Sequence, residues 1–215
     1  MKGQTQAVTA VLITGIVMGG VGSAYFWGVP MLEKREIEQE ITSTEDDVLN
    51  LRDQIVSVSR EGEGASTTVT VDADSISLEP NDEYIQVNNE LDQSAEQGFT
   101  WSLLEGSSTQ NISVGAGDYG IQGEELPGVV AYQSIAGEGS SEINYRVEFR
   151  NLCSTNTGEL SKIDLVPSGQ DRASGEVQIQ VSNQGEQVDN NVVMSEGACE
   201  GRTSRTNTQL QISFQ

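Results

Sequence analysis

The sequence predicts an α+β protein in which a long N-terminal transmembrane and stalk helix precedes an antiparallel β-sandwich or barrel-like domain. The first observation behind this prediction is a stretch without any charged residue, 4–32, followed by an apolar repeat of 3.5 residues. The second is a change of period, because from residue 66 onward apolar and polar residues alternate in short runs. We therefore expect a membrane helix (4–32), a helical stalk (33–60), a linker (61–65) and a β-rich domain (66–215).

The membrane helix is predicted from length and composition. The segment from Ala7 to Trp27 would span about 30 Å as a helix, which matches the hydrocarbon core of a bilayer. Tyr25 and Trp27 suit an interfacial aromatic belt, and the apolar run is too long for a cleaved secretory signal. Gly15, Gly19 and Gly22 either form a groove for a neighbouring helix or reflect the ordinary glycine content of membrane helices.

A short motif stands directly before this apolar run, namely Lys2-Gly3-Gln4. It resembles the class III signal peptide of archaeal type IV pilin-like proteins. The resemblance implies that residues 1–3 are a leader, which a prepilin-type peptidase removes between Gly3 and Gln4. It also implies that the helix is kept as a single-pass anchor and then as the filament core, with the large domain outside the cell.

The family pattern is only partly present. Gln4 and Leu12 match the glutamine and leucine that are common at the first and ninth positions after the cut, whereas Gln6 and Val8 replace a serine and a glutamate. In the family that glutamate is thought to help to register subunits in the filament. Val8 therefore favours the alternative of a permanently anchored protein that does not polymerise.

The stalk carries a heptad pattern with a regular spacing of three and four residues. The functional interpretation is self-association, as a short coiled coil or within a filament, and the alternative is a helix that lies along its own β domain. Ser43 is a candidate cap for a restart of the helix near Thr44. The apolar heptad positions are Ile37, Ile41, Val48, Leu51, Ile55 and Val58.

The β-rich domain is predicted from runs with a period of two. In the clearest run, Ile143–Phe149, the odd positions should be buried, whereas Asn144, Arg146 and Glu148 should lie in water. The expected strands are 67–71, 75–78, 84–87, 100–103, 129–132, 143–149, 163–166, 177–181 and 210–214.

Cys153 and Cys199 are the only cysteines. In an outward-facing domain they are expected to form a disulfide, and two separate buried thiols are the alternative. A bridge that closes about 47 residues would stabilise the fold by roughly 4 kcal/mol in the chain-entropy model. Asn111 lies in the only Asn-x-Ser/Thr sequon and is a possible glycosylation site.

The charge balance excludes several functions. The chain of 215 residues has 33 acidic and 11 basic residues, a net charge of −22 and no histidine. A nucleic acid would be repelled, and catalytic or metal sites that need histidine are absent. The acidity, with only three lysines, favours adaptation to high salt, since the Debye length falls to about 3 Å at 1 M. An ordinary acidic surface protein is the alternative, whereas a disordered acidic chain is disfavoured by the strand-like runs.

No cofactor, metal or enzymatic activity is predicted. The pairs Asp46-Asp47 and Asp72–Asp74 lack the spacing of a calcium loop, and nothing selects two carboxylates for glycoside hydrolysis. Aromatic residues make up 5% of the chain, too few to indicate a sugar-binding platform.

We therefore expect a pilin-like surface subunit, anchored in the cell membrane and assembling into a filament for adhesion or cell-surface structure. Its partners would be membrane lipid, copies of itself and the peptidase. The alternative is an anchored envelope protein whose β domain binds a ligand.

Overall fold

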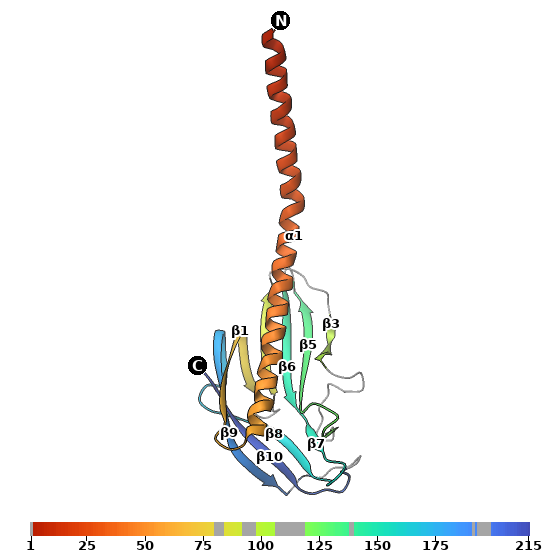
Figure 1. Cartoon of the computed structure of the whole chain (residues 1–215), viewed down its shortest axis with the longest axis vertical. Helices are drawn as coiled ribbons and strands as arrows, with labels where there is room; N and C mark the ends of the chain where they lie inside the picture. Colours follow the sequence, from red (N-terminus) through yellow and green to blue (C-terminus); the bar gives the residue numbers. More distant parts are fainter. Residues whose placement is uncertain are drawn as a thin grey trace. The chain divides into compact units, whose positions relative to one another are not determined.

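The computed structural model describes residues 2–79, 84–91, 98–105, 119–137, 140–190, 192 and 199–215 (Figure 1). The chain divides into two compact units, Met1–Ser43 and Thr44–Gln215, and each is considered by itself. We call the second unit the β module.

One helix, α1 (Lys2–Glu61), runs through both units. It is continuous across Pro30 and Ser43, so the expected restart of the helix near Thr44 is wrong. The helix ends where Gly62 and Gly64 adopt positive φ angles of 91° and 87°, a conformation that glycine reaches without steric cost.

The β module contains one sheet, and all nine runs with a period of two lie within its strands. Among the described residues, the only strands that these runs do not cover are β4 and β7, of three residues each. The strands are β1 (Ser66–Glu79), β2 (Tyr84–Leu91), β3 (Gly98–Glu105), β4 (Tyr119–Ile121), β5 (Gly128–Ala136), β6 (Ser141–Phe149), β7 (Asn151–Cys153), β8 (Leu160–Pro167), β9 (Arg172–Asp189) and β10 (Arg205–Phe214).

The α+β class is confirmed, whereas the sandwich is not. The ten strands described form a single curled sheet in the order β3-β5-β6-β2-β1-β9-β10-β8-β7-β4. Neighbouring strands are mostly antiparallel, and β8–β10 and β4–β7 are parallel. The sheet is a half-barrel with β3 and β4 at its edges. Within the described residues no second sheet packs against it, and a helix covers its inner face (Figure 1).

This helical cover is the Thr44–Glu61 part of α1. Val48, Leu51 and Ile55 are 0% exposed. They face a core built from one side of each long strand, because alternate residues of a strand point to the same face. Inward-facing core residues include Val69, Val71, Ile85, Val87, Tyr145, Val147, Ile179, Val181, Leu210 and Ile212.

Close approach of the helix to the sheet depends on Gly128 in β5. A Cβ atom at this position would lie 2.7 Å from Cγ of Arg52 and 3.0 Å from Cε1 of Phe149. The Arg52 side chain is buried and reaches Asp53 on the same helix, with 2.8 Å between Nε and Oδ1. The missing side chain of Gly128 therefore makes room for the stem of a buried arginine.

Two buried asparagines fix the helix at both ends of its buried stretch. Near the start, Asn89 Nδ2 donates to Thr44 Oγ1 at 2.8 Å. Near the end, Asn183 Nδ2 donates to the carbonyl oxygens of Val58 and Ser59 at 3.0 and 3.4 Å. The last carbonyls of a helix lack partners within it, so Asn183 satisfies groups that would otherwise be buried without a hydrogen bond.

The compact unit thus starts inside the helix at Thr44, and we expect a chain of residues 44–215 to fold. A chain of residues 62–215 should not fold, because the inward face of the sheet would lose its apolar cover. Circular dichroism during urea unfolding should show a cooperative transition for the longer chain only. A cooperative transition of equal midpoint in the shorter chain would contradict this account.

The Asn183 contact can be tested by substitution. Asn183→Ala should lower the free energy of unfolding by about 1–3 kcal/mol, since buried carbonyls lose their donor. Asn183→Asp should cost more, because a carboxylate cannot donate and is repelled by the negative end of the helix.

Gln184→Ala is the matched control, because the neighbouring Gln184 is exposed and bonds to Ser182 and Gln211 on the surface. It should change the free energy of unfolding by less than about 0.5 kcal/mol. If Asn183→Ala and Gln184→Ala changed the free energy of unfolding equally in urea titrations, the hydrogen bonds of Asn183 to the helix would not contribute to stability as proposed.

Candidate functional site

The apolar segment of α1 exposes its side chains all round. Within the described residues, α1 is the one helix that is long and apolar enough to cross a membrane. Its large side chains are 55% to 85% exposed. A helix that is apolar on every side is normally buried in lipid or among other helices. The exposed residues are Leu12, Ile13, Ile16, Val17, Met18, Val21, Tyr25, Phe26, Trp27, Met31 and Leu32.

The expected processing site lies at the beginning of this helix. Gly3 and Gln4 are helical, and their side chains are outside the described residues. Farther along, a Cβ atom at Gly15, Gly19 or Gly22 would meet nothing within 4 Å. The helix surface is therefore open at these glycines.

The heptad residues are divided between the two units. Val48, Leu51, Ile55 and Val58 are buried in the β module, as the alternative of a helix lying along its own β domain requires. Self-association through these four would require the helix to leave the sheet. Ile37 and Ile41 belong to the first unit and are partly exposed.

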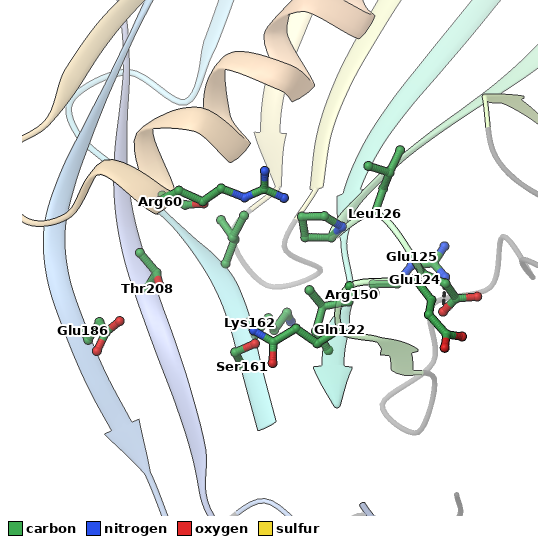
Figure 2. A pocket seen from close by; sticks show the side chains of 15 residues that line it. Arg60, Gln122, Glu124, Glu125, Leu126, Arg150, Ser161, Lys162, Glu186 and Thr208 are labelled. Carbon is green, nitrogen blue, oxygen red and sulfur yellow. Dashed lines mark ion pairs between the residues drawn. The ribbon is translucent and has the colours of Figure 1, made fainter. Parts of the chain in front are cut away.

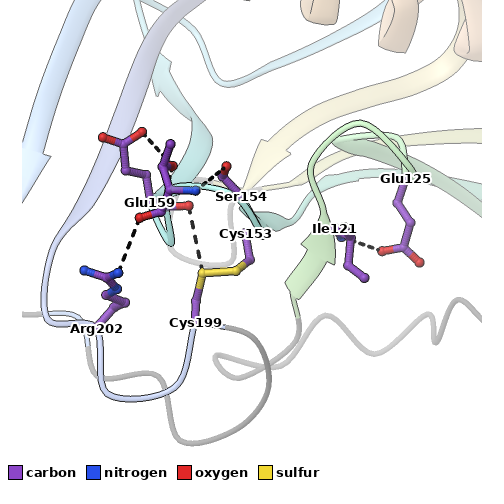
Figure 3. The surroundings of a disulfide bond; sticks show 8 residues. Ile121, Glu125, Cys153, Ser154, Glu159, Cys199 and Arg202 are labelled. Atoms are coloured by element: carbon purple, nitrogen blue, oxygen red, sulfur yellow. Dashed lines mark hydrogen bonds between the residues drawn. A yellow bond between two sulfur atoms is a disulfide. The ribbon is translucent and has the colours of Figure 1, made fainter.

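Cys153 and Cys199 form the expected disulfide, with their Cα atoms 6.0 Å apart (Figure 3). The bridge packs with Leu160, and Val192 lies against this small apolar cluster. It joins the end of β7 to the segment that leads into β10. The predicted glycosylation site, Asn111, lies outside the described residues.

A pocket of about 410 Å³ lies between the last turn of α1, the turn around residues 122–127, and strands β8 and β10 (Figure 2). Leu126 and Ile163 form part of an apolar wall. The charged residues that line it are Arg60, Arg150, Lys162, Glu124, Glu125 and Glu186. Charges of both signs surround this space, so its lining favours no single ligand class.

Two side chains at this pocket show how burial acts on charge. Burial, and next the charge of Arg205, lower the pKa of Lys162 to about 8, against the opposing effect of Asp164. Arg150 is buried, and its Nη1 lies 3.9 Å from Oε2 of Glu125. Lys162, Arg150 and Glu125 all belong to the β module. Their arrangement does not pair a nucleophile with a general base.

The outer face of β6 differs from the prediction that it lies in water. Asn144 is only 5% exposed, and the side chains of Arg146 and Glu148 are 26% and 14% exposed. For Arg146 the reason is that aromatic residues from two other strands cover it. The guanidinium carbon of Arg146 lies 4.0 Å from the ring centre of Tyr84 and 4.5 Å from that of Trp101. This group was missed because its members are far apart in the sequence.

Acidic residues gather where the helix enters the β module. Partial burial and, next, repulsion by Asp46 raise the pKa of Glu45. Partial burial is also the main cause of the raised pKa of Asp47, to which Asp72 and Asp46 add repulsion. A hydrogen bond from the Asp72 backbone N–H, at 3.4 Å, opposes this rise. No group of three or more His, Cys, Asp or Glu that could hold a metal ion occurs among the described residues.

No protein-family model matches this chain, and no curated protein or solved structure is significantly similar to it.

The raised pKa values have a consequence for stability. A carboxyl group whose pKa is raised by folding favours the native state when protonated, so its penalty appears as the pH rises above its ordinary pKa. Asp47→Asn should therefore raise the free energy of unfolding at pH 7 by a few tenths of a kcal/mol, because the group is partly screened by water. The gain should shrink as the pH falls toward 4.

Urea unfolding at pH 7, 5.5 and 4 measures this change. Asp171→Asn is the control, since Asp171 is an exposed residue outside the acidic group around Asp47. If Asp47→Asn and Asp171→Asn gave the same pH profile, the proposed penalty at Asp47 would be refuted.

Proposed function

We propose that this chain is a membrane-anchored surface subunit of the type IV pilin kind, with a structural or adhesive role. The observation that carries the proposal is the apolar segment of α1, whose large side chains are 55% to 85% exposed and have no cover among the described residues. Lipid would cover it in the membrane, and copies of the same helix would cover it in a filament.

Two further features support an outward position of the β module. Disulfides persist in oxidising compartments, and Cys153 and Cys199 are bridged. The Lys2-Gly3-Gln4 motif resembles a class III signal peptide, which implies a domain outside the cell. The net charge of −22 supports a habitat of high salt.

A second candidate is an anchored envelope protein that never polymerises. Val8, in place of the family's glutamate, favours this candidate. In it the apolar segment remains in lipid permanently, and the β module works by binding a ligand.

The proposed processing predicts that the mature chain begins at Gln4. N-terminal sequencing of protein purified from cell membranes should give Gln4 first, and Gly3→Val should block the cut by adding bulk beside the cleaved bond. Gly15→Val is the control within the helix and should leave cleavage unchanged. A mature chain that starts at Met1 would refute the pilin-type route and leave a plain signal anchor.

Immunogold labelling with an antibody against the β module separates the two candidates. Labelled filaments would support the subunit, and label confined to the cell envelope would support the anchored protein. Label found only inside the cell would refute both.

A further inference from the structure

A row of polar and aromatic side chains, all uncharged except Arg146, follows the outer face of the sheet. Cross-strand register places Gln86 opposite Arg146, and Asn88 opposite both Ser75 and Asn144. Residues paired in this way point to the same face of a sheet. We call the group the outer platform and define it as Ser75, Tyr84, Gln86, Asn88, Trp101, Asn144 and Arg146.

One end of the platform is held rigidly by Arg146. Its guanidinium group lies over both the Tyr84 and the Trp101 ring, and its Nη1 is 3.1 Å from Oε1 of Glu148. Trp101 reaches it across β5, where the intervening Ala131, opposite Arg146, is small. The two rings share cation–π contacts with one guanidinium group, which orients them before any ligand arrives.

The middle of the platform is a chain of amides. Gln86 Nε2 donates to Oδ1 of Asn88 at 2.9 Å and to Oδ1 of Asn144 at 3.4 Å. Asn88 Nδ2 donates to Oγ of Ser75 at 3.1 Å. Each amide has two donor hydrogens and an oxygen with two lone pairs, so these bonds use only part of its capacity. Gln86 and Asn88 are partly exposed and can still bond to a ligand, whereas the buried Asn144 orients Gln86.

At its other end the platform opens into a second cavity, of about 500 Å³. Ser75 and Asn88 line this cavity together with the carboxylates of Asp74, Glu90 and Glu142. The four-residue rise from Tyr84 to Asn88 is about 13 Å, or about two to three linked hexoses. The platform and the cavity together thus form a linear surface with room for a short chain of sugars.

We propose that the outer platform binds a neutral hexose polymer. Tyr84 and Trp101 are partly exposed, so the ring surface that Arg146 does not cover can contact the C–H faces of the sugars. The amides match pairs of neighbouring hydroxyl groups. The carboxylates of the cavity accept hydrogen bonds from hydroxyls and repel acidic polymers, as does the net charge of −22.

This interpretation also revises the expectation that aromatic residues are too few for a sugar platform. The fold brings Tyr84 and Trp101 together from β2 and β3, so a low total number does not prevent a local pair. The inference rests on the proposed function in one respect, namely that the platform is displayed at the cell surface. Binding of sugars to the purified protein does not depend on where the protein is located.

Isothermal titration of the purified full-length chain tests the proposal. The detergent should be lauryldimethylamine oxide, because detergents with sugar headgroups would compete. The probes are cellohexaose, mannohexaose and maltohexaose, with hexagalacturonate as the acidic comparison. At least one neutral hexamer should bind with a dissociation constant below the order of 1 mM, and hexagalacturonate should bind at least tenfold more weakly.

Substitutions assign the site. Trp101→Ala should weaken binding about tenfold or more and Trp101→Phe less, while Gln86→Ala should weaken it several-fold. Arg202→Ala is the control, since Arg202 is an exposed arginine near the disulfide, where its Nη2 donates to the carbonyl oxygen of Thr157, and it should leave binding unchanged. Circular dichroism melting of each variant checks that the fold persists.

A second readout does not depend on substitution within the site. In a Trp27→Phe chain, Trp101 is the only tryptophan, so its fluorescence should shift and its quenching by acrylamide should fall when a hexamer binds. The proposal is overturned if no neutral hexamer binds at millimolar concentration. It is equally overturned if binding is unaffected by Trp101→Ala, or if hexagalacturonate binds best.

Discussion

The burial of one helical stripe inside a curled sheet is the interaction on which the β module depends. An open sheet with aliphatic residues along its inner face must be covered, and the Thr44–Glu61 stretch of α1 supplies the cover. Asn89 and Asn183 add specificity to this apolar contact. If the helix moved along the sheet, the amides of Asn89 and Asn183 would be buried without hydrogen-bond partners. The free-energy cost of that shift would exceed the cost of the lost apolar contacts alone.

This arrangement also determines where the charge lies. The helix turns its apolar stripe to the sheet, so acidic residues such as Asp46 and Asp53 are left on its outer side. On the sheet, Glu90 stands directly opposite Glu142, a like-charged pair that destabilises neighbouring strands. The native fold is therefore built with repulsion that dissolved salt reduces, which agrees with the proposal of a habitat of high salt.

The local sequence pattern predicted the strands well because alternation records which side of a strand is buried. It could not predict that Val129–Tyr132 and Ile143–Phe149 share one sheet with Leu210–Phe214, because strand order depends on contacts between distant segments. The heptad pattern predicted that Val48 and Leu51 lie on a buried stripe, but it did not identify what covers the stripe. A helix from another chain and a sheet of the same chain can each cover an apolar stripe of this kind. At Arg146 the polar pattern was misleading, because the rings that cover it come from other strands.

These findings restrict how the proposed filament would be held together. The residues of the heptad from Val48 to Val58 already lie in the core, so they are not free to join subunits. The apolar segment offers close approach at Gly15, Gly19 and Gly22, but a uniformly apolar helix gives little preference for one register over another. Val8 removes the polar group that would specify register within that segment. Register between subunits would therefore have to come from contacts of the β modules, whose outer faces, unlike the helix, carry a varied arrangement of charged, amide and aromatic side chains.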